Sequence, residues 1–224
     1  MTVAVINAKS RDLLEGRLPE GVEPLWYEND EHLLKLAPQA EIAWLDPVTP
    51  VLAAQFIAAA GKLVWYTALS SGVDWLPLQL IAERDVQLTN GSGIHAQSVA
   101  EYAVMGMLTV AKGWRQVVRA QDRHAWLAQP PGKRELLGSK VLVVGAGEIG
   151  GRIAEILRVF GADVTGVRRR PGPGDLGSEE WRGELGRFDW VIAIVPSTPE
   201  TQRMFGEAEF AAMKPGAVFL NFAR

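Results

Sequence analysis

Two groups of residues in this sequence have types and spacing that suggest a ligand-binding role. The first is a set of three glycines, and the second is a set of three arginines that follows one predicted strand later. The segment GAGEIG places Gly145, Gly147 and Gly150 at the spacing of a dinucleotide-binding turn. In such a turn the first glycine permits a tight bend, the second lets a pyrophosphate approach the backbone, and the third lets a helix pack closely on a strand. The unpaired N–H groups that begin this helix then face the phosphates. The pattern predicts a dinucleotide site.

The elements that must position this turn are present on both sides of it. The apolar run 141–144 predicts a parallel strand covered on both faces, and apolar residues recur at helical spacing over 149–160. A glycine motif alone is weak evidence, and an ordinary strand-to-helix turn is the alternative. Because the flanking strand and helix supply the context that the motif requires, we favour the dinucleotide site.

The residues after the next predicted strand, 163–167, bear on which dinucleotide is bound. NAD-selective sites usually carry Asp or Glu about 20 residues after the glycines. This chain instead has Arg168, Arg169 and Arg170, and we expect no carboxylate to compete at that point. Guanidinium groups suit a 2′-phosphate because they form paired, charge-assisted hydrogen bonds. We therefore predict NADP(H) in preference to NAD(H), with a solvated basic turn as the alternative.

Composition limits the other classes of function. The 224 residues, 48% hydrophobic and 22% charged, are enough for two modest globular domains. A net charge of −3 gives no reason to expect nucleic acid or an anionic membrane as a partner. The absence of cysteine excludes disulfides, thiolate catalysis and cysteine-ligated metals, and we predict no metal site. With no signal-peptide pattern and no membrane-length apolar run, we expect a soluble cytoplasmic protein.

Short β-like runs alternate with helical ones, which indicates parallel sheets with helices on their faces. Because open parallel sheets bind ligands outside the carboxyl ends of their strands, residues 196–199 and 222–224 are expected near the dinucleotide. In addition to the elements named above, the predicted strands are 3–6, 41–45, 63–66, 86–88, 188–195 and 217–221, and the predicted helices are 31–37, 51–60 and 207–213.

A long helical pattern separates the two groups of predicted strands. It begins at Ser98 and runs toward Trp126, with a break expected near Gly113 and a proline-rich joint after it. We therefore predict a first domain over 1–97, a bridging helix and linker over 98–132, and a dinucleotide-binding domain over 133–224.

With these elements in this order, the sequence resembles the D-isomer-specific 2-hydroxyacid dehydrogenase family. The resemblance implies an α/β protein of two lobes, a flavodoxin-like substrate domain and a Rossmann-type, doubly wound parallel-sheet cofactor domain that is incomplete at its C-terminal end. The arginines and residues 93–102 look most like the NADP-dependent glyoxylate/hydroxypyruvate reductases of the family. The segments that carry the resemblance are 63–76, 89–102, 145–150, 195–201 and 213–224.

The resemblance also implies a reaction and the residues that serve it. A small 2-oxo acid is reduced to a D-2-hydroxy acid by hydride from the nicotinamide, and subunits pair through the long helix, which implies a homodimer. Arg224 matches the arginine that holds the substrate carboxylate, and Ser71 and Gly72 match a loop whose backbone N–H groups bind its other side. Further cofactor positions match Glu148 and Ile149 at the pyrophosphate, Pro196 after the next strand, and Phe222 and Ala223 beside the nicotinamide half.

The sequence departs from the family in its catalytic acid. Family members continue beyond the arginine and there supply a histidine tuned by a glutamate, whereas His32, His95 and His124 do not match that histidine. His95 lies in the hinge segment, where a hinge or substrate-contact role is more economical than a substitute acid. Three interpretations therefore stay open: an NADP-dependent reductase, a binding protein that senses nicotinamide cofactors, and an inactive fragment.

Overall fold

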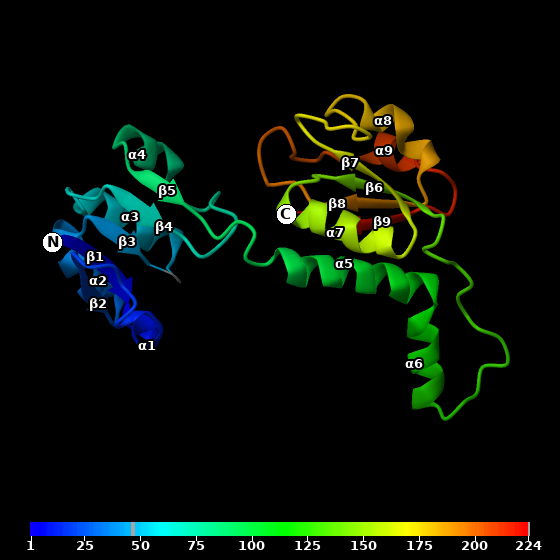
Figure 1. Ribbon diagram of the computed structural model, residues 1–224, viewed down its shortest axis with the longest axis horizontal. Coiled ribbons are helices and arrows are strands. Elements are labelled where there is room, and N and C mark those ends of the chain that lie inside the picture. Colours follow the sequence, from blue (N-terminus) through cyan, green and yellow to red (C-terminus); the bar gives the residue numbers. More distant parts are fainter. Residues whose placement is uncertain (46–47, 224) are drawn as a thin grey trace. The chain divides into compact units, whose positions relative to one another are not determined.

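The computed structural model describes residues 1–45 and 48–223, and the chain divides into two compact units, Met1–Ser92 and Gly93–Arg224. Every strand pairing among the described residues is parallel, which confirms the predicted α/β class (Figure 1). Each unit has a sheet and an apolar core of its own. Within the described ranges, no helix combines the length and the apolar character needed to cross a bilayer.

The first unit is a five-stranded sheet in the order β2-β1-β3-β4-β5, the flavodoxin-like order that the resemblance implies. Its core includes the fully buried Phe56 and Ile57 of one helix and Tyr66 of the sheet. The strands are β1 (Thr2–Asn7), β2 (Val22–Tyr27), β3 (Ile42–Trp44), β4 (Trp65–Thr67) and β5 (Gln87–Thr89), and the helices are α1 (Arg11–Leu14), α2 (Asp30–Leu36), α3 (Pro50–Ala59) and α4 (Leu78–Glu83).

Strand β2 and helix α4 were not among the predicted elements. Pro24 lies inside β2, and proline argues against a strand because it cannot donate to the ladder. The structure tolerates it because β2 is at the edge of the sheet and pairs only with β1, where Pro24 lies opposite Ala4. Helix α4 has six residues, too few to show a helical period in the sequence.

The second unit is a four-stranded sheet in the order β7-β6-β8-β9. A single parallel bridge between Val167 and Leu176 extends this sheet beyond β7. The chain proceeds from β6 to β7 in one direction and from β8 to β9 in the other, so the topological switch point lies between β6 and β8. The strands are β6 (Lys140–Val144), β7 (Asp163–Val167), β8 (Trp190–Ala193) and β9 (Val218–Asn221), and the helices are α5 (Ala96–Ala111), α6 (Trp114–Asp122), α7 (Glu148–Val159), α8 (Trp181–Glu184) and α9 (Glu207–Ala212).

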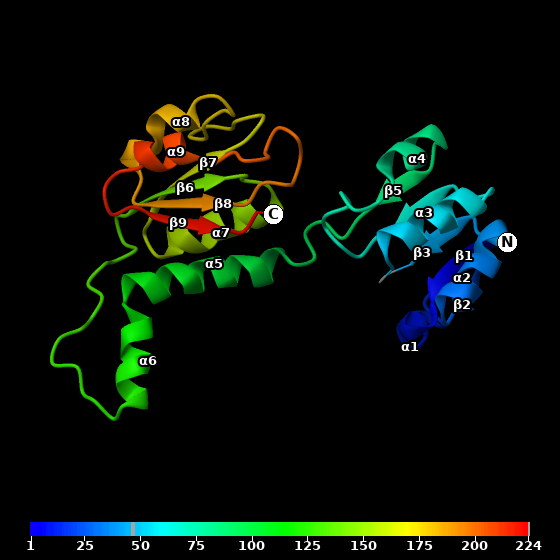
Figure 2. The same cartoon turned by 180° about the vertical axis from the view of Figure 1, so that it is seen from behind.

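Helices cover both faces of this second sheet, as Figures 1 and 2 show from opposite sides. On one face α5 and α7 pack against each other and, through Met107 and Ile153, on the apolar side chains of β6 and β8. On the other face Trp181 of α8 is fully buried and lies 5.0 Å, centroid to centroid, from Phe205. The central strands β6 and β8 are buried on both faces. Their sequences are therefore continuous apolar runs and do not alternate between apolar and polar residues.

The predicted long helix is two helices, broken near Gly113 as expected. Gly113 has a φ of +60°, and a Cβ there would lie 2.9 Å from the carbonyl carbon of Pro131. A Cβ on Gly132 would lie 2.2 Å from the carbonyl carbon of Lys112. The proline-rich joint therefore packs directly on the break between α5 and α6.

Asp189 joins the amino ends of three strands in the second unit. Its carboxylate accepts from the backbone N–H of Lys140 at 2.8 Å and pairs with Lys214 at 2.5 Å, and its backbone carbonyl accepts from Val218. Partial burial would raise the pKa of Asp189, but the hydrogen bonds from Lys214 and Lys140 outweigh it and lower the pKa. The carboxylate therefore stabilises the strand register at neutral pH, and this contribution is lost as the pH falls through the lowered pKa.

Candidate functional site

The glycine turn has the geometry that its sequence predicts. It follows β6 directly, and Gly145 has a φ of +104° with its missing Cβ only 2.5 Å from the carbonyl oxygen of Ile194. Only glycine fits that position, for reasons of both backbone conformation and space. Gly147 is exposed, and a Cβ there would meet no atom within 4 Å. It opens onto free space in front of α7, which fits the approach of a pyrophosphate.

Gly150 sets how closely α7 approaches the turn. A Cβ on Gly150 would lie 2.4 Å from the carbonyl oxygen of Gly145 and 3.0 Å from Cγ1 of Val143. The first hydrogen bond of this helix runs from the N–H of Gly151 to the carbonyl of Gly147 at 2.7 Å. The N–H groups of residues 148–150 therefore have no acceptor within the helix and carry its partial positive charge. Glu148 is exposed and Ile149 is half-buried. The N–H groups at this end of the helix can therefore bind an anion.

The three arginines lie at the carboxyl end of β7, the neighbour of β6 in the sheet. All three side chains are exposed. The prediction that no carboxylate competes at this point is wrong, because Nε of Arg168 forms an ion pair of 2.9 Å with Oδ2 of Asp175. The residues after the arginines fold back on β7, since the N–H of Arg168 donates to Leu176 and the N–H of Leu176 donates to Gly166. Asp175 is therefore a neighbour of the candidate site that the sequence did not predict.

The loop after β8 lies at the same end of the sheet and is closed by its own hydrogen bonds. Thr201 Oγ1 donates to the carbonyl of Pro196 at 2.5 Å and accepts from the N–H of Thr198 at 2.9 Å. The pKa of Glu200 is lowered, chiefly by a hydrogen bond that its carboxylate accepts from Thr198, with a smaller contribution from the charge of Arg169.

Phe222 and Ala223 follow β9 and continue its path beside β8. The N–H of Phe222 donates to the carbonyl of Ala193 at 2.8 Å, and the N–H of Ala223 donates to the side chain of Asn221 at 2.9 Å. Since all these strands are parallel, the turn, the arginines, Pro196 and residues 222–223 share one end of the sheet. Arg224 lies outside the described residues.

Ser71 and Gly72 belong to the first unit, in the loop after β4. The loop after β5 braces them: Ser71 Oγ donates to the carbonyl of Gly91 at 2.9 Å, and Asn90 Nδ2 donates to the carbonyl of Ser71 at 2.7 Å. Because the Ser71 hydroxyl donates to Gly91, its proton is not available to a ligand. In the described parts of the chain, no group of three or more His, Asp or Glu side chains is placed to hold a metal ion.

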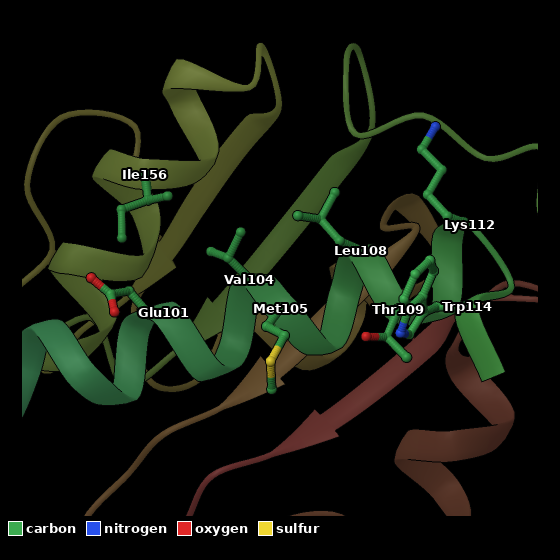
Figure 3. Close-up of a pocket in the computed structure, with 8 residues that line it drawn as sticks. All are labelled: Glu101, Val104, Met105, Leu108, Thr109, Lys112, Trp114 and Ile156. Atoms are coloured by element: carbon green, nitrogen blue, oxygen red, sulfur yellow. The ribbon is translucent and has the colours of Figure 1, made fainter. Parts of the chain in front are cut away.

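An open apolar pocket of about 440 Å³, which the sequence did not predict, lies along α5. Figure 3 shows Glu101 near one end of it and Lys112 near the other, with apolar side chains between them. It does not share residues with the glycine turn. The lining residues are Glu101, Val104, Met105, Leu108, Thr109, Lys112, Trp114 and Ile156.

Comparison with known proteins identifies the architecture. Residues 104–224 match the family model described as the NAD binding domain of D-isomer specific 2-hydroxyacid dehydrogenases. The chain belongs to this family. The matched part contains the glycine turn, the arginines and the strands of the second sheet, and so assigns them to the cofactor-binding domain of these dehydrogenases.

The whole chain is similar to dehydrogenases of this family. D-3-phosphoglycerate dehydrogenase of Mycobacterium leprae is 28% identical over 231 residues, which cover all of this chain and 44% of that protein. Glyoxylate/hydroxypyruvate reductase A of Serratia proteamaculans is 27% identical over 225 residues, covering 94% of this chain and 67% of that protein. A crystal structure of a D-isomer specific 2-hydroxyacid dehydrogenase family protein from Aeromonas salmonicida has 29% identity and a TM-score of 0.84, and the match covers 100% of this chain and 73% of that one. The chain thus spans less than half the length of the first of these relatives.

Proposed function

We propose that this dehydrogenase uses NADP(H) to reduce a small 2-oxo acid of the glyoxylate or hydroxypyruvate type to a D-2-hydroxy acid. The observation that carries the proposal is the placement of a cluster of arginines at the carboxyl end of β7, beside the glycine turn that follows β6. A pyrophosphate on the N-terminus of α7 leaves the adenine ribose near the end of the next strand. There we expect the guanidinium groups to bind a 2′-phosphate.

The roles of the chain's own residues follow from chemistry and from the family. The bound nicotinamide supplies or accepts the hydride. Arg224 is proposed to hold the substrate carboxylate, because its planar fork binds two oxygens at once and its charge stabilises the developing alkoxide. The backbone of Ser71 and Gly72 is proposed to receive the other side of that carboxylate.

Turnover is the experiment that tests this function. We expect tight NADPH binding and an oxidation of NADPH, followed as loss of absorbance, that requires glyoxylate or hydroxypyruvate. The control is the same mixture without the 2-oxo acid. A flat trace with intact NADPH binding would favour the cofactor-sensing alternative, and loss of both binding and turnover would contradict the proposal.

We also propose that the protein is a homodimer that pairs through α5 and the start of α6. Tyr102, Met105, Val110 and Trp114 are at least half exposed on these helices, although their side chains are large and apolar. We expect sedimentation to give twice the mass of the chain, and Met105→Glu combined with Trp114→Glu to reduce it to one chain. Val159→Glu, on the exposed end of α7, is the matched control and keeps the mass of the dimer. A single-chain mass for the unmutated protein at micromolar concentration would refute the pairing.

A further inference from the structure

We propose that Asp175 is a specificity-determining residue that positions the guanidinium of Arg168 for the 2′-phosphate of NADP(H). This inference rests on the proposed use of NADP(H). The two side chains form an ion pair of 2.9 Å between Nε and Oδ2, with 47% of the Arg168 side chain exposed but only 15% of the Asp175 side chain. The carboxylate is thus the fixed partner, and the guanidinium keeps an accessible side.

The backbone fixes the position of Asp175. The N–H of Asp175 donates to the carbonyl of Gly172 at 3.0 Å, and the N–H of Gly172 approaches Oδ2 of Asp175 at 3.4 Å. The N–H of Leu176 then donates to Gly166 at 2.8 Å, and the N–H of Arg168 donates to Leu176 at 3.1 Å. The pair is therefore held within a turn tied to β7, unlike an ordinary surface ion pair between two mobile side chains.

A glycine in β7 makes room for the carboxylate. A Cβ on Gly166 would lie 2.6 Å from Oδ1 of Asp175 and 2.8 Å from Cβ of Ala146, the second residue of the glycine turn. The Asp175 carboxylate and the glycine turn therefore both lie against Gly166 of β7. This places Asp175 beside the glycine turn, although the chain separates it from Gly145 by a helix and a strand.

The geometry leaves the phosphate-binding side of Arg168 available. A guanidinium has N–H donors at Nε and at both Nη atoms, and the Asp175 contact uses Nε. The Nη donors can then bind two oxygens of a phosphate in parallel. Since immobilising a mobile side chain costs affinity, prior fixation of Arg168 should strengthen NADPH binding by about 3- to 10-fold. The neighbouring charges are Arg169 and Arg170 on the same segment and Glu200 on the loop after β8.

The test is a double-mutant cycle on cofactor affinity, read by fluorescence titration with NADPH and with NADH. Asp175→Asn should weaken NADPH binding by about 3- to 10-fold and leave NADH binding unchanged within about twofold. In the Arg168→Ala background, Asp175→Asn should have no further effect on NADPH. Asp163→Asn, an exposed aspartate at the opposite end of β7, is the matched control and should change neither constant.

Three outcomes would overturn the inference. NADPH binding that stays the same or tightens in Asp175→Asn would show that the carboxylate does nothing for the phosphate or repels it. Equal losses for NADPH and NADH, repeated in Asp175→Ser, would show a merely structural role. If the unmutated protein binds the two cofactors equally, the proposed NADP(H) preference fails and this inference fails with it. If Asp175→Asn keeps the full preference for NADPH over NADH, only the role of Asp175 is refuted.

Discussion

Gly150→Ala is expected to destabilise the protein and to abolish most of its cofactor binding, whereas Gly151→Ala, one residue later on α7, is not. The added methyl group at Gly150 meets the carbonyl oxygen of Gly145 at 2.4 Å, which is backbone and cannot rotate away. The turn or the helix must therefore move. Overpacking of this kind costs about 1–3 kcal/mol of unfolding free energy. Since the same movement displaces the N–H groups that we propose to bind the phosphates, we expect NADPH affinity to fall by more than the stability loss alone would cause.

Gly151 provides the matched control. A Cβ there meets nothing within 4 Å, and alanine in a helix interior is about 0.5–1 kcal/mol more favourable than glycine. Urea denaturation and NADPH titration of both variants compare their unfolding free energies and their cofactor affinities. Equal stability and equal affinity for the two variants would show that α7 does not need its close approach to the turn.

Arg168→Asp is expected to reverse the preference between the two cofactors. The substitution removes the proposed charge-assisted hydrogen bond to the 2′-phosphate, worth about 1.5–3 kcal/mol, and adds a repulsive carboxylate. The new carboxylate can accept from the 2′-hydroxyl of NADH, as acidic residues do at this position in NAD-selective sites. Together these effects predict a change of about 100-fold in the ratio of the NADPH and NADH dissociation constants.

The same titration carried out on Arg17→Asp controls for the change in net charge. Arg17 is exposed in the first unit, so this variant carries the same charge reversal outside the unit that contains β7. We expect it to keep the preference of the unmutated protein. An Arg168→Asp variant that still binds NADPH more tightly than NADH would show that another group recognises the phosphate.

The glycine turn and its flanking elements could be predicted because their physical signals are local. Strand β6 is an uninterrupted apolar run, the glycines occupy fixed positions, and α7 shows a clear period. Strand β2 could not be predicted in this way, because its tolerance of Pro24 depends on its place at the sheet edge. That place is set by the whole sheet and not by the residues of the strand.

Asp175 shows the same limit within the candidate site. It follows Arg168 after an irregular segment rich in proline and glycine, and no period or motif links the two residues. Only the return of the chain to β7, through the bonds of Leu176, brings the carboxylate to the guanidinium. The hydrogen bond from Asn90 to Ser71 could not be predicted either, because it joins the loops that follow two different strands.

Titration of the unmutated protein with NADPH and with NADH, in the same low-salt buffer, tests most directly whether the arginines after β7 recognise a 2′-phosphate. Low salt is required because screening weakens interactions between exposed charges. We predict that NADPH binds about tenfold more tightly or better, which corresponds to about 1.4 kcal/mol or more. Equal dissociation constants, or tighter binding of NADH, would contradict the account.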